Sequence, residues 1–164
     1  MPLEPALVES DLSDTVSASV VRDFVPHFAP GARLVYARLT RAQVVYCDEA
    51  VFCELGLQPK PHSKMPDLLL WDETRQWLFV VDSLTSRGWI NPKRHAQLKA
   101  LFAGAKLGCV YISACPSRKI MANYIVDPAW ETEAWAADEP VHLIHFGGDR
   151  FSGPRKMPSQ LVKI

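Results

Sequence analysis

The alternation of apolar and polar positions along the chain predicts a series of short strands. Two apolar runs near the middle, residues 67–71 and 77–84, are separated by the polar segment 72–76 and therefore predict a hairpin. Residues 107–113 form a continuous apolar run, which is typical of a strand buried on both faces. Shorter strands are predicted over residues 34–39, 43–47, 133–136 and 141–146.

Four helices are predicted from the 3.6-residue periodicity and from residues that suit helix ends. The first covers residues 15–25, after Asp14, and ends at Pro26 and the Pro30-Gly31 pair. The other three each follow an N-cap residue: Asp48 precedes 49–55, Asn91 and Pro92 precede a helix that buries Leu98, Leu101 and Phe102, and Ser117 precedes a helix to about residue 125. This order of elements predicts an α/β fold with a mixed β-sheet and helices on its faces. We expect one domain over residues 11–164 after a loose N-terminus over residues 1–10.

The composition is that of one globular domain, with 164 residues of which 48% are hydrophobic and 22% are charged. The 18 basic and 18 acidic residues balance, which excludes a polybasic tail, an acidic tail and a highly charged disordered chain. No apolar run approaches the roughly 20 residues of a membrane span, and no basic segment precedes an apolar stretch. We therefore expect a soluble, cytoplasmic protein that has no membrane partner.

The four cysteines, at positions 47, 53, 109 and 115, form two pairs with five residues between the members of each pair. Structural zinc sites usually have about two to four residues between paired cysteines, so this spacing argues against zinc. We expect free thiols, most of them buried.

The balanced total charge conceals an uneven distribution. Residues 83–126 contain seven basic residues (Arg87, Lys93, Arg94, Lys99, Lys106, Arg118 and Lys119) and no acidic one. Such a stretch can form a basic surface that faces phosphates. The alternative is a solvated face neutralised by acidic residues of the first half, where residues 1–82 carry 12 acidic and 7 basic residues.

The predicted hairpin brings two aspartates together. If its turn is centred between Thr74 and Arg75, residues whose numbers sum to 149 lie opposite each other, and Asp67 and Asp82 form such a pair. Two carboxylates that face each other in an apolar sheet are destabilising unless something neutralises them. A divalent cation would do so, and hard oxygen ligands suit Mg²⁺. The alternatives are that one aspartate is protonated, or that both end their strands near water.

The residues that follow the hairpin carry cations and hydroxyl groups toward the same edge of the sheet. The helix after Asn91 begins with Lys93, Arg94 and His95, although cations oppose the dipole at a helix N-terminus. These cations indicate an anionic partner, either the carboxylates of the neighbouring strand or a phosphate, with a purely structural salt bridge as the alternative. Just after Asp82, the segment 85–87 supplies further donors to this edge: Thr85, Ser86 and Arg87.

Several segments together resemble the BsuBI/PstI family of type II restriction endonucleases, over about residues 11–155. The segments that carry the resemblance occur in the family's order: KMPDLLLWD at 64–72, WLFVVDSLTS at 77–86, PKRH at 92–95, WETE at 130–133 and HLIHFGGDRFSGP at 142–154. The resemblance implies the restriction-endonuclease-like fold of PD-(D/E)xK nucleases, which is a mixed sheet flanked by helices. It also implies Mg²⁺-dependent cleavage of phosphodiester bonds.

The resemblance implies a catalytic role and a metal-binding role for two residues. Asp67 matches the family's Pro-Asp motif, and Asp82 stands where the family has a glutamate, so its side chain is one methylene shorter. The lysine of the general motif is replaced by Leu84, and the family also has an apolar residue there. The catalytic cation must then come from elsewhere, and Lys93 is the first candidate and Lys64 the second.

Two further positions depart from the family pattern. Arg87 stands where the family is expected to have histidine, and Arg38-Leu39 stands where a Gly-Asp pair is common. Family enzymes usually begin with a separate helical domain that helps to read DNA, whereas this chain proceeds directly to the nuclease-like region. The departures leave open whether the protein cleaves DNA or is a degenerate homologue that only binds it.

The implied partner is double-stranded DNA, contacted through Thr85, Ser86, Arg87 and Arg94. Cleavage of both strands implies a homodimer on a palindromic site. A cognate DNA methyltransferase is implied as a genetic partner rather than a physical one. A third hypothesis dispenses with DNA and leaves a small α/β interaction domain with a solvated basic face.

Overall fold

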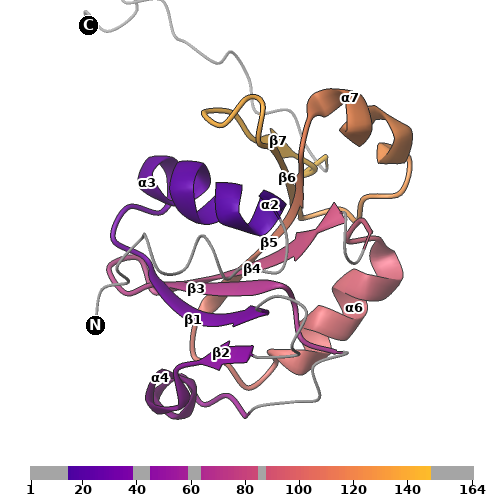
Figure 1. The fold of residues 1–164 in the computed structure, drawn as a ribbon. Helices are drawn as coiled ribbons and strands as arrows, with labels where there is room; N and C mark the ends of the chain where they lie inside the picture. Colours follow the sequence, from indigo (N-terminus) through magenta and orange to yellow (C-terminus); the bar gives the residue numbers. More distant parts are fainter. Residues whose placement is uncertain (1–14, 39–44, 59–63, 85–87, 149–164) are drawn as a thin grey trace, which may run out of the picture.

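The computed structural model describes residues 15–38, 45–58, 64–84 and 88–148, which build one seven-stranded mixed sheet (Figure 1). The strands lie in the order β2-β1-β3-β4-β5-β6-β7. Their bounds are β1 Arg33–Arg38, β2 Val45–Cys47, β3 Leu68–Asp72, β4 Trp77–Ser83, β5 Gly108–Cys115, β6 Glu133–Ala136 and β7 Ile144–His145. The pairs β4–β5 and β5–β6 are parallel, whereas the other neighbouring pairs are antiparallel. The predicted mixed sheet with flanking helices is therefore confirmed.

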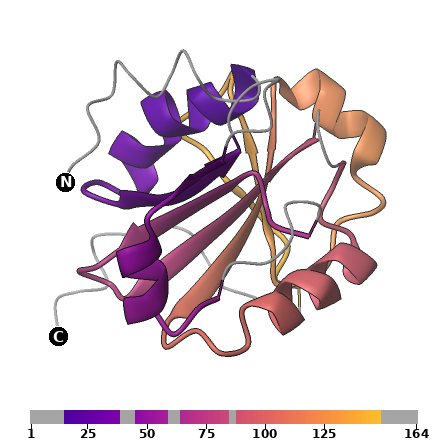
Figure 2. The same ribbon diagram turned by 60° about the horizontal axis from the view of Figure 1, so that its bottom comes forward.

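Helices cover both faces of this sheet, so that two main apolar cores form (Figures 1 and 2). On one face, the helical segment formed by α2 (Thr15–Ser19), η1 (Val20–Phe24) and α3 (Val25–Phe28) packs with Phe24 against Phe79 and Trp135. On the other face, α4 (Glu49–Glu54) contributes Phe52 and α6 (Pro92–Leu101) contributes Leu98 to the second core. The remaining helices, α7 (Arg118–Met121) and the 3₁₀ turn η2 (Ala122–Tyr124), close a smaller cluster beside β5 and β6.

Three of the four predicted N-caps are confirmed by hydrogen bonds. The side chains of Asp48, Asn91 and Ser117 accept bonds from the backbone N–H groups three residues later, at 3.1, 2.8 and 3.2 Å. Of the residues expected to be buried by α6, Leu98 and Phe102 are buried, while Leu101 is half-buried. The fourth predicted cap, Asp14, lies outside the described residues, as do the N-terminal residues 1–10.

The prediction that Pro26 ends the first helix was wrong. The helical segment continues to Phe28, with a π-helical stretch over Val20–Phe24 immediately before α3. Pro26 lies in the first turn of α3, directly after the π-helical stretch in which the Val25 N–H donates to Val20 O, so the helical path continues through a residue that has no N–H to donate. The segment then ends at Ala29, and Gly31 follows with a φ of +80°.

Two predicted strands are also corrected. The strand predicted over residues 141–146 is reduced to Ile144–His145, because the chain turns over residues 137–141 and the His142 N–H donates to Glu139 O at 3.2 Å. The strand predicted as fully buried is buried only from Tyr111 onward, while its first three residues are partly exposed. Among the helices of the described ranges, none is long and apolar enough to cross a membrane.

Candidate active site

The hairpin formed by β3 and β4 places Asp67 and Asp82 opposite each other, as predicted. Its register pairs Leu68 with Val81 and Leu69 with Val80, so the numbers of facing residues sum to 149. The N–H of Asp67 extends this ladder by donating to Val81 O at 3.0 Å. Both aspartates are buried, with exposed fractions of 1% and 0%. Because facing residues of an antiparallel pair point to the same side, both carboxylates share the sheet face that is covered by α4 and α6.

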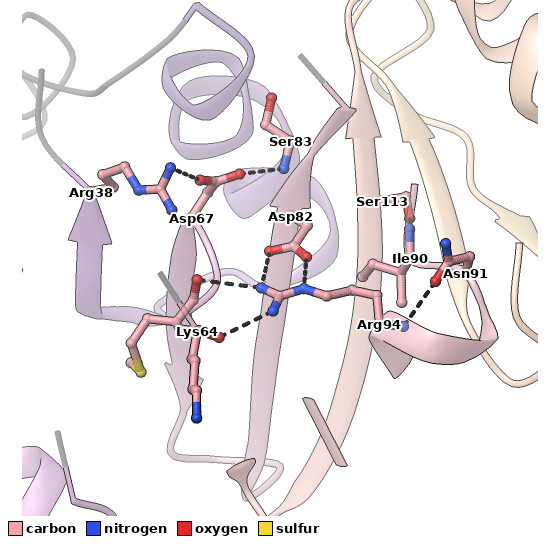
Figure 3. A network of polar contacts seen from close by, with 10 residues as sticks. Arg38, Lys64, Asp67, Asp82, Ser83, Ile90, Asn91, Arg94 and Ser113 are labelled. Atoms are coloured by element: carbon pink, nitrogen blue, oxygen red, sulfur yellow. Dashed lines mark hydrogen bonds and ion pairs between the residues drawn. The ribbon is translucent and has the colours of Figure 1, made fainter. Parts of the chain in front are cut away.

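Asp82 is neutralised by Arg94 of α6 (Figure 3). The Arg94 Nε atom donates to Asp82 Oδ2 at 2.7 Å, and Nη2 donates to Oδ1 at 3.2 Å. The same guanidinium donates to the carbonyl oxygens of Lys64 at 3.1 Å and Met65 at 3.3 Å. Arg94 therefore ties the strand that carries Asp82 to the segment that leads into Asp67, and this two-pronged geometry gives a strong charge-assisted contact.

The start of α6 is fixed by contacts from the neighbouring strand. Ser113 of β5 lies beside Asp82 in the parallel register, and its hydroxyl oxygen accepts a bond from the Ile90 N–H at 3.0 Å. Asn91 then caps the helix, and its side chain accepts from the Arg94 N–H. Since Ser113 is fully buried, this chain of contacts fixes where Arg94 enters the site.

Asp67 has different partners from Asp82. Its Oδ2 atom accepts a bond from the Ser83 N–H at 2.7 Å, and its Oδ1 atom lies 3.5 Å from Nη1 of Arg38 at the end of β1 (Figure 3). From the sequence, Arg38 was expected only to be a departure from the family pattern and not a residue of the site. The sequence shows only that Arg38 ends an apolar strand; the pairing of that strand with β3, which brings Arg38 to Asp67, is known from the structure.

The other residues predicted for the site are placed less closely. Lys93 lies exposed in the first turn of α6, next to Arg94 in the chain. Lys64 is also exposed, and it contributes its carbonyl oxygen to Arg94. Thr85, Ser86 and Arg87 lie outside the described residues.

The basic stretch is partly neutralised by acidic residues. Arg94 pairs with Asp82 of the first half of the chain, and Arg118 pairs with Glu139 at 3.3 Å. The four lysines of this stretch are exposed: Lys93, Lys99, Lys106 and Lys119. Neutralisation by an acidic residue of the first half is thus seen for Arg94, whereas Glu139 lies outside that half and the four lysines are exposed one by one.

The carboxylates of Asp67 and Asp82 fit a hard divalent cation whose remaining ligands are other oxygen atoms. Within the described residues, no group of three or more His, Cys, Asp or Glu side chains could hold a metal ion. Mg²⁺, however, is often bound by one or two carboxylates, with waters and substrate phosphate oxygens as further ligands. Asp67 and Asp82, opposite each other on adjacent strands, meet that requirement, although an arginine now neutralises each of them.

The cysteines do not form a site of this kind. All four are free, with Cys115 buried, Cys47 and Cys109 half-buried and Cys53 exposed. The free state agrees with the prediction, but only one of the four thiols is fully buried.

Comparisons with known proteins agree with the geometry. Residues 8–149 match the model of the BsuBI/PstI restriction endonuclease domain. The chain is 43% identical over 136 residues to the type II restriction enzyme BsuBI of Bacillus subtilis, covering 83% of this chain and 43% of that enzyme. It is 27% identical over 140 residues to the type II restriction enzyme AplI of Arthrospira platensis, covering 81% of this chain and 43% of that enzyme.

A solved structure shows the same architecture. The SdaI restriction endonuclease matches with a TM-score of 0.80 and 38% identity, over 95% of this chain and 47% of that protein. The restriction-endonuclease-like fold is therefore confirmed. The chain spans somewhat less than half the length of each relative that it matches.

Proposed function

Because this chain belongs to the BsuBI/PstI restriction endonuclease family, we propose that it acts as a type II endonuclease. It would hydrolyse phosphodiester bonds of double-stranded DNA at specific sites, with Mg²⁺ as cofactor. One observation carries the proposal: Asp67 and Asp82 are buried side by side at one end of the central hairpin. Two buried carboxylates on adjacent strands have no evident purpose in a purely structural sheet, where they repel each other.

Asp67 and Asp82 would hold the metal ion through their carboxylate oxygens. When bound, the ion would lower the pKa of a coordinated water and neutralise charge on the scissile phosphate. The Ser83 N–H and Arg38 keep the Asp67 carboxylate in a fixed orientation from two sides. Lys93, exposed at the start of α6, would stabilise the negative charge that develops on the phosphate during in-line attack.

Arg94 has a dual role under this proposal. In the protein alone it neutralises Asp82 and keeps the carboxylate in place. Each carboxylate oxygen has two lone pairs, so Asp82 could bind a metal ion while it still accepts a bond from Arg94. A DNA phosphate that competes for the guanidinium could replace one of the two bonds. A guanidinium released at this point would be well placed to bind two phosphate oxygens of DNA, a geometry that arginine favours.

The remaining DNA contacts and the assembly are proposed from chemistry. Thr85, Ser86 and Arg87 follow Asp82 closely in the chain and would contact the DNA backbone near the cleaved bond. The exposed lysines of residues 83–126 would strengthen binding through charge, so that affinity falls as salt rises. A homodimer would bring two such sites to the two strands, and a cognate methyltransferase would protect the host DNA.

A second candidate function, DNA binding without cleavage, is favoured by the arginines themselves. Arg38 and Arg94 neutralise both carboxylates without a metal ion, so the sheet is stable in a state that needs none. Under this alternative, binding is independent of divalent metal and does not require the Asp82 carboxylate.

The test is incubation of the purified protein with mixed-sequence plasmid DNA, with and without Mg²⁺. Discrete fragments that require Mg²⁺ and disappear in Asp67→Ala would support the endonuclease. The matched control is Asp72→Ala, because Asp72 belongs to the same hairpin but pairs with Arg75 at its opposite end. Intact DNA with Mg²⁺ and with Mn²⁺, combined with salt-sensitive binding, would instead support the non-cleaving alternative.

A further inference from the structure

A pocket lies on the other side of α6 from the two carboxylates. It has a volume of about 570 Å³ and is bordered by three segments: the face of α6 that carries Pro92, His95 and Lys99, the segment Ala129–Glu131, and Gly147–Gly148. This volume falls within the range of about 300–1,000 Å³ that is typical of small-molecule and cofactor sites. None of its residues takes part in the contacts of Asp67 or Asp82 described above.

The aromatic wall of the pocket is Trp130, which is 69% exposed although it is a large apolar side chain. Its ring rests on the backbone of Gly148: a Cβ atom built on that glycine would lie only 2.7 Å from Cζ3 of Trp130. Gly148 also has a φ of +55°, which disfavours any other residue. The chain thus holds an indole ring in place while leaving most of it in contact with solvent.

The polar groups of the pocket have mixed character. Lys99 is cationic and Glu131 is anionic. Burial, with a further contribution from Lys99 and against an opposing one from Glu131, lowers the pKa of His95. This favours the neutral imidazole, which offers one donor and one acceptor. A pocket with no net charge is poorly suited to an extended run of phosphates, but it is suited to a ligand that carries one phosphate and a flat polar ring.

The backbone of Glu131 supports a functional interpretation. Apart from Gln76 in the hairpin turn, Glu131 is the one non-glycine residue of the described ranges with a positive φ, at 65°. Its N–H is tied to Phe146 O at 2.7 Å, which keeps the residue in this unfavourable conformation beside Trp130. Unfavourable backbone conformations of this kind are concentrated at binding and catalytic sites.

We propose that this pocket receives one unpaired nucleotide of the DNA, with its base stacked on Trp130 and its phosphate next to Lys99. The carboxylate of Glu131 would accept a hydrogen bond from an exocyclic amino group of the base, and His95 would bind a second atom of the base edge. The inference rests on the proposed function in that the ligand is DNA. The position of the pocket agrees with a DNA ligand because it lies next to the proposed cleavage site: Arg94 faces the carboxylates, and the next residue, His95, faces the pocket.

Binding without metal tests the pocket separately from cleavage. End-labelled duplexes, one blunt and one with a short single-stranded extension, are titrated with protein in EDTA and followed by fluorescence anisotropy. The wild-type protein should bind the extended duplex more tightly. Trp130→Ala should lose this extra affinity for the extended duplex, and the loss should be about 5- to 140-fold if one base stacks on the ring. Its affinity for the blunt duplex should equal that of the wild type.

Three further variants sharpen the comparison. Lys99→Ala should weaken binding of the extended duplex, and Gly148→Ala should do the same because it displaces Trp130 without removing it. The matched control is Trp77→Ala, because Trp77 is also partly exposed, at 40%, but lies at the opposite end of β4 from Asp82. This control should bind both duplexes like the wild type. Thermal unfolding of each variant checks that it is folded.

The outcomes separate the pocket from the nuclease. The proposal would be overturned if Trp130→Ala and the wild type had equal affinity for the extended duplex. It would also be overturned if Trp130→Ala lost the same amount of affinity for the blunt duplex as for the extended one. A free deoxynucleoside monophosphate that binds in a Trp130-dependent manner while the extension adds nothing would overturn it as well. If Trp130-dependent binding is found but plasmid DNA stays intact with Mg²⁺, the proposed nucleotide pocket is supported and the proposed endonuclease activity is contradicted.

Discussion

Replacing Arg94 by methionine should destabilise the protein strongly, because it would leave the Asp82 carboxylate buried without its counter-ion. Asp82 has an exposed side-chain fraction of 0% and that of Arg94 is 14%, so water screens the pair poorly. Breaking a buried ion pair from one side typically costs about 3–5 kcal/mol. For a chain of this length, that loss corresponds to a fall of about 6–20 °C in Tm. Urea unfolding and thermal melting, both without divalent metal, measure the change.

A double variant separates the lost charge from lost packing. Arg94→Met combined with Asp82→Leu removes both charges, and buried pairs replaced by apolar residues are often neutral or more stable. We therefore expect the double variant to recover most of the stability that the single variant loses. The coupling between the two sites is read from the full mutant cycle.

Mg²⁺ adds a second comparison to this cycle. If Asp67 and Asp82 can bind the ion, millimolar Mg²⁺ should raise the stability of Arg94→Met, since a ligand that binds only the folded state stabilises it. The double variant lacks one of the two carboxylates and should respond less. A loss of less than about 1 kcal/mol in Arg94→Met would contradict a buried, poorly screened ion pair, because that is the size expected of an exposed pair.

Three further predictions concern other parts of the chain. Although burial opposes the effect, hydrogen bonds from Arg75 lower the pKa of Asp72 below its ordinary value of 3.8. The ionised Asp72 side chain therefore stabilises the fold above pH 3.8, and this stabilisation is lost as the pH falls through the lowered pKa. In urea unfolding, the stability difference between wild type and Asp72→Asn should shrink below about pH 4. The exposed Cys53 should react with iodoacetamide in the folded protein, whereas Cys115, which is buried and whose pKa is raised to about 11 by burial, should react only on unfolding, as peptide mass mapping would show. Asn91→Ala should lower stability by about 0.5–2 kcal/mol through loss of the α6 cap, and wild-type stability of this variant in urea would contradict the role of the cap.

The hairpin register could be predicted from the sequence because local chemistry determines it. The polar segment between two apolar strands fixes where the chain reverses, and the period of two then determines which residues face each other. Asp67 and Asp82 were expected to face each other for this reason, and the observed register confirms it. The Asn91-Pro92 start of α6 was predictable for the same reason, since a helix cap depends on neighbours in the chain.

The partners of the two aspartates depend on long-range packing and were harder to predict. Arg38 reaches Asp67 from a different strand, and the order of strands in the sheet does not follow from periodicity. Arg94 was expected to face either the carboxylates of the neighbouring strand or a phosphate and was then assigned to DNA, whereas the structure pairs it with Asp82. The sequence alone does not show which way a side chain leaves its helix. The missed π-helical turn before α3 likewise depends on how that segment packs on the sheet.

The order in which these partners occur along the chain has a consequence for folding kinetics. The two aspartates lie 15 residues apart in one hairpin, whereas Arg38 and Arg94 belong to elements on either side of it. Local hairpins close in about 1–10 μs, before distant elements dock. Arg94 is only 12 residues from Asp82, but Arg38 is 29 residues from Asp67, so the hairpin can bring the two carboxylates together before Asp67 has its counter-ion. Repulsion at that stage would raise the barrier to forming the hairpin. We expect Asp82→Asn to refold faster than the wild type in stopped-flow experiments, although its native state is less stable. The carboxylate pair that is proposed to bind the metal would then also slow the folding of the sheet that holds it.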